Sequence, residues 1–515
     1  MKTVKNAVGR EIPLELDNRT LVPYKGAFGH RPPASYIGAP TGWIKPGEKK
    51  LLDSIEDAIK KCKLQDGMTI SFNHHLRNGD FVVNNVLDII SDMGIKNLRL
   101  APSALFPVHE PLIEHIKNGV IDRIEGSMNG PVGNFVSHGG LPHPAILRSH
   151  GARVRAIRVG EIPIDLAFIA APAADSYGNA NGVLGKNVCG SLGYSMVDMV
   201  LARKSIVITD NLVPYPCIPM SIKQQYVDYV VEVDSIGDNM KIVSGTTKVT
   251  TDPNRLGIAE SAANVIKYSG VYRDGMSYQA GAGGISLATT KMLGEFLEED
   301  KYCCRFIDGG VTQHVVDILE KGLCKYILDG QSFDVSSVES LLNNPKHIEI
   351  SPDFYANIHN KGCLVNVLDS AVLGATEVDV DFNVNVNTHS DGRLLHGIGG
   401  HQDVCAGSDL TIITCPVYRK TNPIVMDSVT TITTPGEVVD VIVTDHGVAV
   451  NPKRKDLLNN LKDSPVNLIT IDELRDIAYD ATGGKQELHV KDDIICLIQW
   501  RDGTVIDTVR QVEDE

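Results

Sequence analysis

Three side chains that can carry positive charge lie close together in one segment, which reads Ser71-Phe-Asn-His-His-Leu-Arg-Asn-Gly-Asp80. Such a group suits a ligand with several carboxylates, because arginine can bind a carboxylate through two parallel hydrogen bonds. A zinc site and a purely structural histidine pair are the alternatives, although adjacent histidines on an extended chain point to opposite sides. The candidate binding residues are Asn73, His74, His75, Arg77, Asn78 and Asp80, and no metal site is predicted.

A second segment is rich in glycine and reads Gly397-Ile-Gly-Gly-His-Gln-Asp-Val-Cys-Ala-Gly-Ser408. It matches neither the G-x-G-x-x-G dinucleotide fingerprint nor the Gly-Lys-Ser/Thr of a P-loop. Because glycine lets a ligand approach the backbone closely, the segment predicts contact with a planar or charged group. A hairpin-like turn is the alternative. The candidate site residues here are Gly399, Gly400, His401 and Asp403.

A third segment, Gln279-Ala-Gly-Ala-Gly-Gly-Ile-Ser286, nearly completes the dinucleotide fingerprint, with Ser286 in place of the third glycine. The sequence places it between a strand and a helix, whose N-terminal amides would favour an anion. That anion could be a pyrophosphate or a developing oxyanion, and a plain strand-to-helix turn is the remaining interpretation. The candidate residues are Gln279, Gly281, Gly283 and Gly284.

These segments sit in a chain that looks internally duplicated. Asp66–Ser71 resembles Asp274–Gln279, 208 positions later, and each is followed by a loop and an amphipathic helical pattern. A second pair, Glu161–Asp165 and Glu377–Asp381, is offset by 216, and Asp175 then matches Asp391. We therefore predict two related α/β domains with open, mainly parallel sheets, comprising an N-terminal extension (1–45), a first domain (46–240) and a second domain (241–515).

Strand patterns support this architecture. Ser205–Asp210 and Val438–Thr444 read as buried strands of a parallel sheet, and Leu166–Ala174 as another. Glu377–Thr388 alternates between valine or phenylalanine and acidic or amide residues, which predicts one long strand. In open sheets of this kind, ligands bind at the carboxyl ends of the strands. We expect the site at the domain interface, because both halves contribute glycine loops.

Bulk composition limits the possible partners. The chain has 515 residues, 43% of them hydrophobic, and a formal net charge of −15, which argues against a nucleic-acid or membrane-surface binder. The N-terminus lacks the apolar region of a signal peptide, and no apolar run could span a bilayer. The ten cysteines form no C-x-x-C pair, so we expect reduced thiols in a cytoplasmic protein. A basic segment, 139–158, predicts either a docking patch or a solvated loop.

Taken together, these motifs resemble the family I coenzyme A transferases and, more closely, the alpha subunits of bacterial citrate lyases. The resemblance runs from about residue 20 to beyond residue 475. Besides the duplication and the segments 71–80 and 397–403, it rests on Phe168–Gly182, Cys189–Tyr194, Ile208–Pro216, Phe382–Asn387 with Ser390–Gly392, and Val448–Pro452.

The resemblance implies that citrate displaces acetate from an acetyl thioester of acyl-carrier protein, giving a citryl thioester and free acetate. Acetyl-CoA or the phosphopantetheine-bearing carrier is the implied co-substrate, with no permanently bound cofactor. The implied partners are the carrier (gamma) and citryl lyase (beta) subunits, in a homo-oligomer within a larger cytoplasmic complex. Gly399 and Gly400 then become oxyanion donors beside His401, while Asp403 and the Gln279–Gly284 loop contact the thioester.

One departure from the family pattern concerns the nucleophile. Many family I transferases carry a nucleophilic glutamate in a loop shortly after the helix of the second half, and Cys304 occupies that place here. We therefore expect citrate to attack the thioester directly, without an enzyme-glutamyl intermediate. Glu377 is the alternative nucleophile, although its position at the start of an acidic strand face favours a structural or acid/base role.

Overall fold

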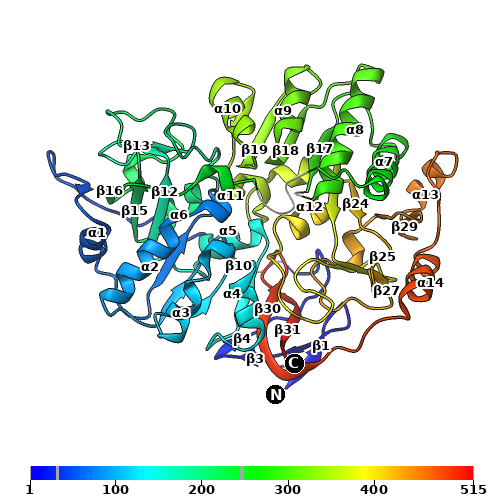
Figure 1. Cartoon of the computed structure of the whole chain (residues 1–515), viewed down its shortest axis with the longest axis horizontal. Helices are drawn as coiled ribbons and strands as arrows, with labels where there is room; N and C mark the ends of the chain where they lie inside the picture. Colours follow the sequence, from blue (N-terminus) through cyan, green and yellow to red (C-terminus); the bar gives the residue numbers. More distant parts are fainter. Residues whose placement is uncertain (1, 31–33, 244–248, 282, 514–515) are drawn as a thin grey trace.

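The computed structural model describes residues 2–30, 34–243, 249–281 and 283–513, and it contains two large sheets side by side (Figure 1). The first sheet is parallel throughout and has seven strands. In spatial order they are β5 (Leu51–Leu52), β16 (Tyr229–Glu232), β15 (Lys204–Thr209), β12 (Leu166–Ala171), β6 (Thr69–Phe72), β7 (Leu98–Leu100) and β9 (Ile121–Ile124). The predicted strands at 166–174 and 205–210 are confirmed as β12 and β15.

The second sheet has eight strands and is parallel except at one edge, where β29 runs antiparallel to β28. In spatial order they are β29 (Val448–Val450), β28 (Val441–Val443), β24 (Leu410–Thr414), β21 (Ser370–Gly374), β17 (Ser277–Ala280), β18 (Phe306–Val311), β19 (Ile327–Ser332) and β20 (His347–Glu349). The mixed α/β class with two mainly parallel sheets is therefore confirmed.

Helices connect the strands in both halves, and none of the described helices combines the length and apolar character needed to cross a membrane. Those of the first half are α1 (Ile55–Cys62), α2 (Val82–Asp92), α3 (Leu112–Lys117), α4 (Pro131–Ser137), α5 (His150–Arg158) and α6 (Ser195–Leu201). Those of the second are α7 (Pro253–Tyr268), α8 (Gly284–Asp300), α9 (Gln313–Glu320), α10 (Val335–Asn343), α11 (Pro352–Ala356), α12 (His401–Gly407), α13 (Lys455–Leu461) and α14 (Ile471–Thr482). The two helices predicted after the duplicated strands are α2 and α8.

The duplication is visible in the strand order. Six strands of the first sheet, β16-β15-β12-β6-β7-β9, correspond in sequence to β28-β24-β21-β17-β18-β19 of the second. The first sequence match is confirmed, because β6 and β17 take the same central place. The second match is wrong: Glu161–Asp165 precedes β12, whereas Glu377–Asp381 follows β21, the counterpart of β12.

The true counterpart of Asp175 is Asp379, 204 positions later. Asp175 accepts hydrogen bonds from the amides of residues 177, 178 and 179, and Asp379 does the same for residues 381 and 383. Each turn joins an antiparallel pair, β13 (Ala173–Ala174) with β14 (Ala180–Asn181), and β22 (Glu377–Asp379) with β23 (Val384–Asn385).

The same turn corrects the prediction of one long strand over Glu377–Thr388. The chain reverses at Phe382, whose φ of 64° lies in the left-handed region, and the segment folds into the β22–β23 hairpin. Its amide residues do not face solvent, since Asn385 and Asn387 are fully buried. The alternating pattern gave the wrong prediction because the asparagine side chains form buried hydrogen bonds instead of a solvated face.

Segments close to both ends of the chain meet below the two sheets. The hairpin of β30 (Val490–Gln499) and β31 (Val505–Val512) pairs in parallel with β11 (Ala145–Leu147) of the first half, although the sequence predicts 241–515 as one domain. Residues of the predicted 1–45 extension complete the assembly: the Asn6 side chain donates to the carbonyls of Val505 and Ile506. We call this assembly the terminal clasp.

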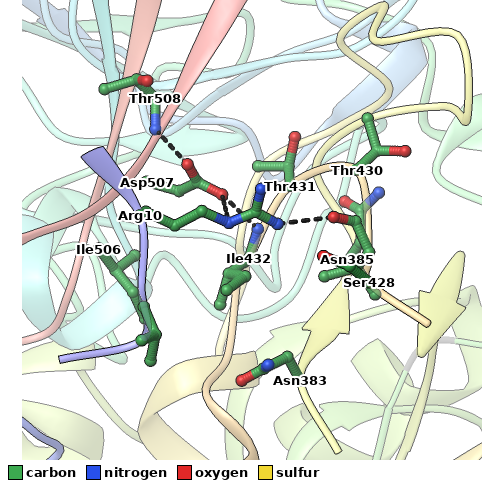
Figure 2. Close-up of polar contacts among 12 residues, drawn as sticks. Arg10, Asn383, Asn385, Ser428, Thr430, Thr431, Ile432, Ile506, Asp507 and Thr508 are labelled. Carbon is green, nitrogen blue, oxygen red and sulfur yellow. Dashed lines mark hydrogen bonds and ion pairs between the residues drawn. The ribbon is translucent and has the colours of Figure 1, made fainter. Parts of the chain in front are cut away.

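Figure 2 shows a central contact of the terminal clasp. The Arg10 Nε lies 3.2 Å from the Asp507 Oδ2 of β31, and a second Arg10 nitrogen donates to the Val429 carbonyl at 2.6 Å. Asp507 also accepts the Ile432 amide at 2.7 Å. The guanidinium therefore links the N-terminal segment, the C-terminal hairpin and the loop after β27 (Val425–Met426) of the second half.

The basic segment 139–158 is not a docking patch or a solvated loop. Arg148 donates to Glu125 at 2.6 Å, and Arg153 forms two hydrogen bonds with Asp198, all within the interior. Burial would raise the pKa of Glu125, but Arg148 and two further arginines outweigh it and lower that pKa to about 2. The arginines of this segment thus form buried ion pairs that hold α5 in place.

Candidate active site

The two halves meet at the carboxyl ends of their central strands, where α5 packs against α11 (Figure 1). His74 follows β6 of the first half, and its Nε2 lies 3.0 Å from the Gln331 Oε1 of β19 in the second. Its Nδ1 lies 2.6 Å from the Ser103 hydroxyl. This ring therefore bridges the two halves at the place where parallel sheets bind ligands.

His74 is uncharged in this position. Burial lowers its pKa well below the usual value, and the nearby ionisable groups His150, Arg77 and His75 reinforce the shift by disfavouring a further positive charge. When the neutral His74 ring donates its Nδ1–H to the Ser103 hydroxyl, its unprotonated Nε2 needs a hydrogen-bond donor. The side-chain nitrogen of Gln331 is buried and has no other partner in the described part of the chain. Turning the Gln331 amide over satisfies both groups, so the residue is best placed as a donor to His74.

Arg77 is the cation of the site. Its guanidinium carbon lies 5.0 Å from the Phe106 ring centre and 5.1 Å from that of Phe333, so it is held between one aromatic ring of each half. Burial lowers the pKa of Arg77 to about 10, and no carboxylate among the described residues lies within ion-pair distance. Its Nε is buried without a partner, and its φ of 52° is a strained conformation.

The other predicted residues of this segment divide into two groups. Asn73 contacts the cluster, because its amide donates to the Ser195 hydroxyl at the start of α6. His75 contacts the Ala170 carbonyl of β12 at 3.1 Å, Asn78 accepts the Val108 amide, and Asp80 caps α2 and contacts His109. The side chains of these three are engaged with partners of the first half and shape the loop.

The Gly397–Ser408 segment is the start of a helix rather than a hairpin turn. Gly400 is the residue before α12, and the Gly399 carbonyl accepts the His150 amide at 2.9 Å. A Cβ on Gly400 would lie 2.5 Å from the Tyr355 hydroxyl oxygen, so only glycine fits. Within the described part of the chain, the amides of Gly399 and Gly400 donate no hydrogen bond, and both remain available to a ligand.

His401 and Asp403 do not face this opening. Both ring nitrogens of His401 are engaged, with the Thr434 hydroxyl at 2.8 Å and the Gly374 carbonyl at 3.2 Å, and burial lowers its pKa to about 4. Asp403 is fully buried and accepts hydrogen bonds from the Ser149 hydroxyl and the Gly151 amide. It fixes the first turn of α5 and therefore positions His150.

The segment from Gln279 to Gly284 joins a strand to a helix, as predicted: Gln279 lies in β17 and Gly284 begins α8. Its glycines are less open than expected, because the Gly281 amide is already bonded to the Val372 carbonyl at 2.7 Å. Gly283 precedes the helix and Gly284 begins it. The Gln279 amide donates to the Tyr355 hydroxyl at 2.8 Å, so this side chain reaches Gly400 only through Tyr355.

The environment of the Glu377 carboxylate does not suit a nucleophile. It is fully buried, its Oε2 accepts the Asn385 amide and the Thr430 backbone amide at 2.8 Å, and its Oε1 accepts the Thr430 hydroxyl at 3.0 Å. The bond from Asn385 joins the two strands of the β22–β23 hairpin, and the two bonds from Thr430 tie that hairpin to the loop after β27. This geometry favours the structural role over attack on a thioester.

Replacing Glu377 with glutamine should therefore weaken folding and spare turnover. We expect a loss of about 1–3 kcal/mol in the free energy of unfolding, since charged acceptors are lost in the interior, with kcat within about threefold of wild type. Denaturant unfolding and initial rates measure the two effects. Asp381→Asn, an exposed change in the same hairpin, serves as the control. A large loss of kcat with unchanged stability would make Glu377 a reacting group.

Cys304 does not stand at the site either. It lies just before β18, at the amino end of that strand, where its backbone pairs with that of Cys324 and both thiols are free. The carboxyl end of β18 instead carries Gly309 and Gly310, and a Cβ on Gly310 would lie 1.9 Å from the Phe333 ring. Asp308, the acid of this strand, is buried without partners, and burial raises its pKa well above the usual range.

Sequence reasoning missed several groups that the fold brings into this site, namely His150, Tyr194, Gln331, Phe333 and Tyr355. His150, Gln331 and Phe333 contact loops of the opposite half, whereas Tyr194 and Tyr355 contact residues of their own half that are far away in sequence, so no local spacing could reveal them. His150 had a weak signal, because it directly follows Ser149, whose hydroxyl caps α5. In the described residues, no group of three or more histidine, cysteine or acidic side chains could hold a metal ion.

The fold and the site between its halves define the class. The alpha subunit of a malonate decarboxylase from Acinetobacter baumannii shares this fold, with a TM-score of 0.63 over 85% of this chain and 87% of that one, at 16% identity. This places the protein among the coenzyme A transferase-like folds. Within that class the chain belongs to the citrate lyase alpha subunit family (CitF), whose model matches residues 48–512.

Individual relatives agree with the family assignment. The citrate lyase alpha chain of Haemophilus influenzae is 47% identical over 468 residues, covering 91% of this chain and 94% of its own. That of Klebsiella pneumoniae is 45% identical over 487 residues, covering 94% and 96%. A Streptococcus mutans protein assigned as the alpha subunit of citrate lyase and solved in complex with citrate has a TM-score of 0.96 and 46% identity, covering 99% and 100% of the chains. The protein is therefore an enzyme subunit with a transferase function.

Proposed function

We propose that the protein moves the acyl-carrier thiol from acetate to citrate. A citrate carboxylate oxygen attacks the carbonyl carbon of the acetyl thioester, and the carbonyl electrons move onto oxygen. Collapse of this oxyanion expels the thiolate and leaves a citric–acetic anhydride. The thiolate then attacks the citryl carbonyl and releases acetate, so no net proton or electron is exchanged.

The observation that carries this proposal is Arg77, a buried cation that no carboxylate of the described chain neutralises. An unneutralised guanidinium next to the bridging His74 segment is a partner for a multiply charged anion, which supports binding of citrate. The citrate complex of the Streptococcus mutans relative supports the same ligand. The free amides of Gly399 and Gly400 then lie on the His150 side of the cluster, where they would stabilise the thioester oxyanion.

Direct attack by citrate agrees with the acids near the site. Glu377 is held by Asn385 of its own hairpin and by Thr430, and burial raises the pKa of Asp308 well above the usual range, which disfavours the carboxylate form that a nucleophile needs. We infer that the subunit works with a carrier protein bearing phosphopantetheine and with a citryl-cleaving subunit, as in the family to which the chain belongs. Acetyl-CoA would serve as a smaller surrogate for the carrier.

An exchange assay tests the proposal. Purified protein is incubated with citrate and acetyl-CoA, or with an acetylated carrier protein, and citryl thioester and acetate are measured by mass spectrometry. We expect both products in equal amounts and no CoA adduct on the intact protein. Citramalate and acetate in place of citrate measure the selectivity for the acid. Absence of a citryl thioester with both carriers would refute the transfer, and a stoichiometric CoA adduct would refute direct attack.

A further inference from the structure

His150 lies beside Gly399 and Gly400, whose amides donate no hydrogen bond within the described chain, and it is not among the site residues predicted from the sequence. It is the first residue of α5, and its amide binds the Gly399 carbonyl. Its Nε2 lies 3.8 Å from the place where a Cβ of Gly399 would be, and its Cδ2 lies 3.5 Å from that of Gly400. The ring therefore lies next to the two glycines that carry the free amides.

Contacts from three elements fix the orientation of the His150 ring. Asp403 accepts hydrogen bonds from the hydroxyl of Ser149 and the amide of Gly151, the residues on either side of His150. The Tyr194 ring lies 5.3 Å from the imidazole centre at 67°, and its hydroxyl bonds to Nδ1. Because α12, α5 and the loop before α6 all contribute, the orientation of the ring is fixed before any ligand arrives.

The contact with Tyr194 decides which ring nitrogen carries the proton. Burial, aided by Arg153, lowers the pKa of His150 to about 4, so the ring is neutral and holds a single N–H. The buried Tyr194 hydroxyl has no other partner among the described residues, so its proton must go to Nδ1. The remaining N–H of His150 is then on Nε2, which has no acceptor within the described chain.

We propose that His150 is a catalytic residue, whose Nε2–H donates a hydrogen bond to the oxyanion of the tetrahedral intermediate beside the amides of Gly399 and Gly400. The inference rests on the proposed transfer and adds a third donor to it. A neutral donor suits this reaction, because the oxyanion returns to a carbonyl when the thiolate leaves. The electrons move out to oxygen and back, while the imidazole proton stays on nitrogen throughout.

Two substitutions at one position test the role. His150→Leu removes the donor, whereas His150→Gln places an amide N–H at about the position of Nε2. The rate of citryl-CoA formation in a single turnover should fall about 100-fold in His150→Leu and recover to within about tenfold of wild type in His150→Gln. Citrate affinity, measured by calorimetry, should stay within about threefold in both, which also shows that the site is folded.

Two results would overturn the role of His150 while leaving the transfer intact. The first is an active wild-type enzyme with His150→Gln as slow as His150→Leu. The second is an ionisation near pH 6.5 in the wild-type rate profile that is missing from His150→Gln, since that would make His150 a base. Titration of Asp403, whose pKa burial raises to about 6, would appear in both proteins. An inactive wild-type protein would instead refute the proposed transfer itself.

Discussion

Replacing Arg77 with methionine should raise the KM for citrate about 100-fold and leave the KM for acetyl-CoA within about threefold. Methionine keeps an unbranched apolar stem but lacks the guanidinium that lies near the Phe106 and Phe333 rings, so the change removes the charge and its hydrogen-bond donors. Loss of a charged hydrogen-bond partner in a buried site costs about 2–5 kcal/mol, which is enough for this effect. Steady-state rates with each substrate varied in turn measure both constants.

The choice of controls makes the Arg77 result specific. Arg77→Lys retains the charge but not the planar fork, and it should give an intermediate KM for citrate. Arg203→Met removes an arginine whose side chain is 72% exposed, and both constants should remain unchanged. Equal increases in the KM of citrate and of acetyl-CoA in Arg77→Met would contradict the assignment of Arg77 to the acid.

Replacing Gly400 with alanine should lower kcat about 100-fold. The new Cβ would lie 2.5 Å from the Tyr355 hydroxyl oxygen, and Tyr355 cannot yield because it is buried and bonded to Gln279. The Gly399–Gly400 backbone must therefore move by roughly 1 Å, and such a misplacement of catalytic groups costs about two orders of magnitude. Single-turnover rates and citrate binding separate this effect from a loss of affinity.

A second change should reverse the first. In Gly400→Ala combined with Tyr355→Phe, the crowding oxygen is gone and the nearest ring carbon lies 3.4 Å from the Cβ, an ordinary contact. We expect kcat to recover to within about tenfold of the Tyr355→Phe enzyme. Gly257→Ala, on an exposed helix position with nothing near its Cβ, is the matched control and should be neutral. A double variant no faster than Gly400→Ala alone would exclude crowding as the cause.

The sequence predicted the fold class because periodic patterns and a repeated strand–loop–helix unit are local properties. It placed β12, β15, α2 and α8 correctly for this reason. It failed at Glu377–Thr388, where a left-handed residue and an aspartate turn reverse the chain within an otherwise perfect alternation. Side-chain hydrogen bonds of that kind compete with strand formation and leave little periodic trace.

The site was predicted only in part, for a related reason. Arg77, His74 and the glycines stood out because unusual residues cluster in short segments. Nothing local distinguishes His401 from His150, yet the fold gives the first ring two internal partners and leaves the Nε2 of the second without one in the described chain, beside Gly399 and Gly400. Which half supplies the groups opposite a loop depends on how the duplicated sheets face each other, and residue spacing carries no information about that.

The terminal clasp has a consequence for the order in which the molecule can form. Asn6 binds Val505, which lies 499 positions later in the sequence. The contacts of β1 (Thr3–Lys5) and its neighbours with the C-terminal hairpin therefore cannot form until almost the whole described chain has been made. At about 5–20 residues per second, a ribosome needs roughly 25–100 s to supply that partner. During this interval both sheets can fold, but β11 lacks its neighbour β30 and Arg10 lacks Asp507. Nascent chains of this protein should therefore acquire their full resistance to proteases only after the last hairpin is made.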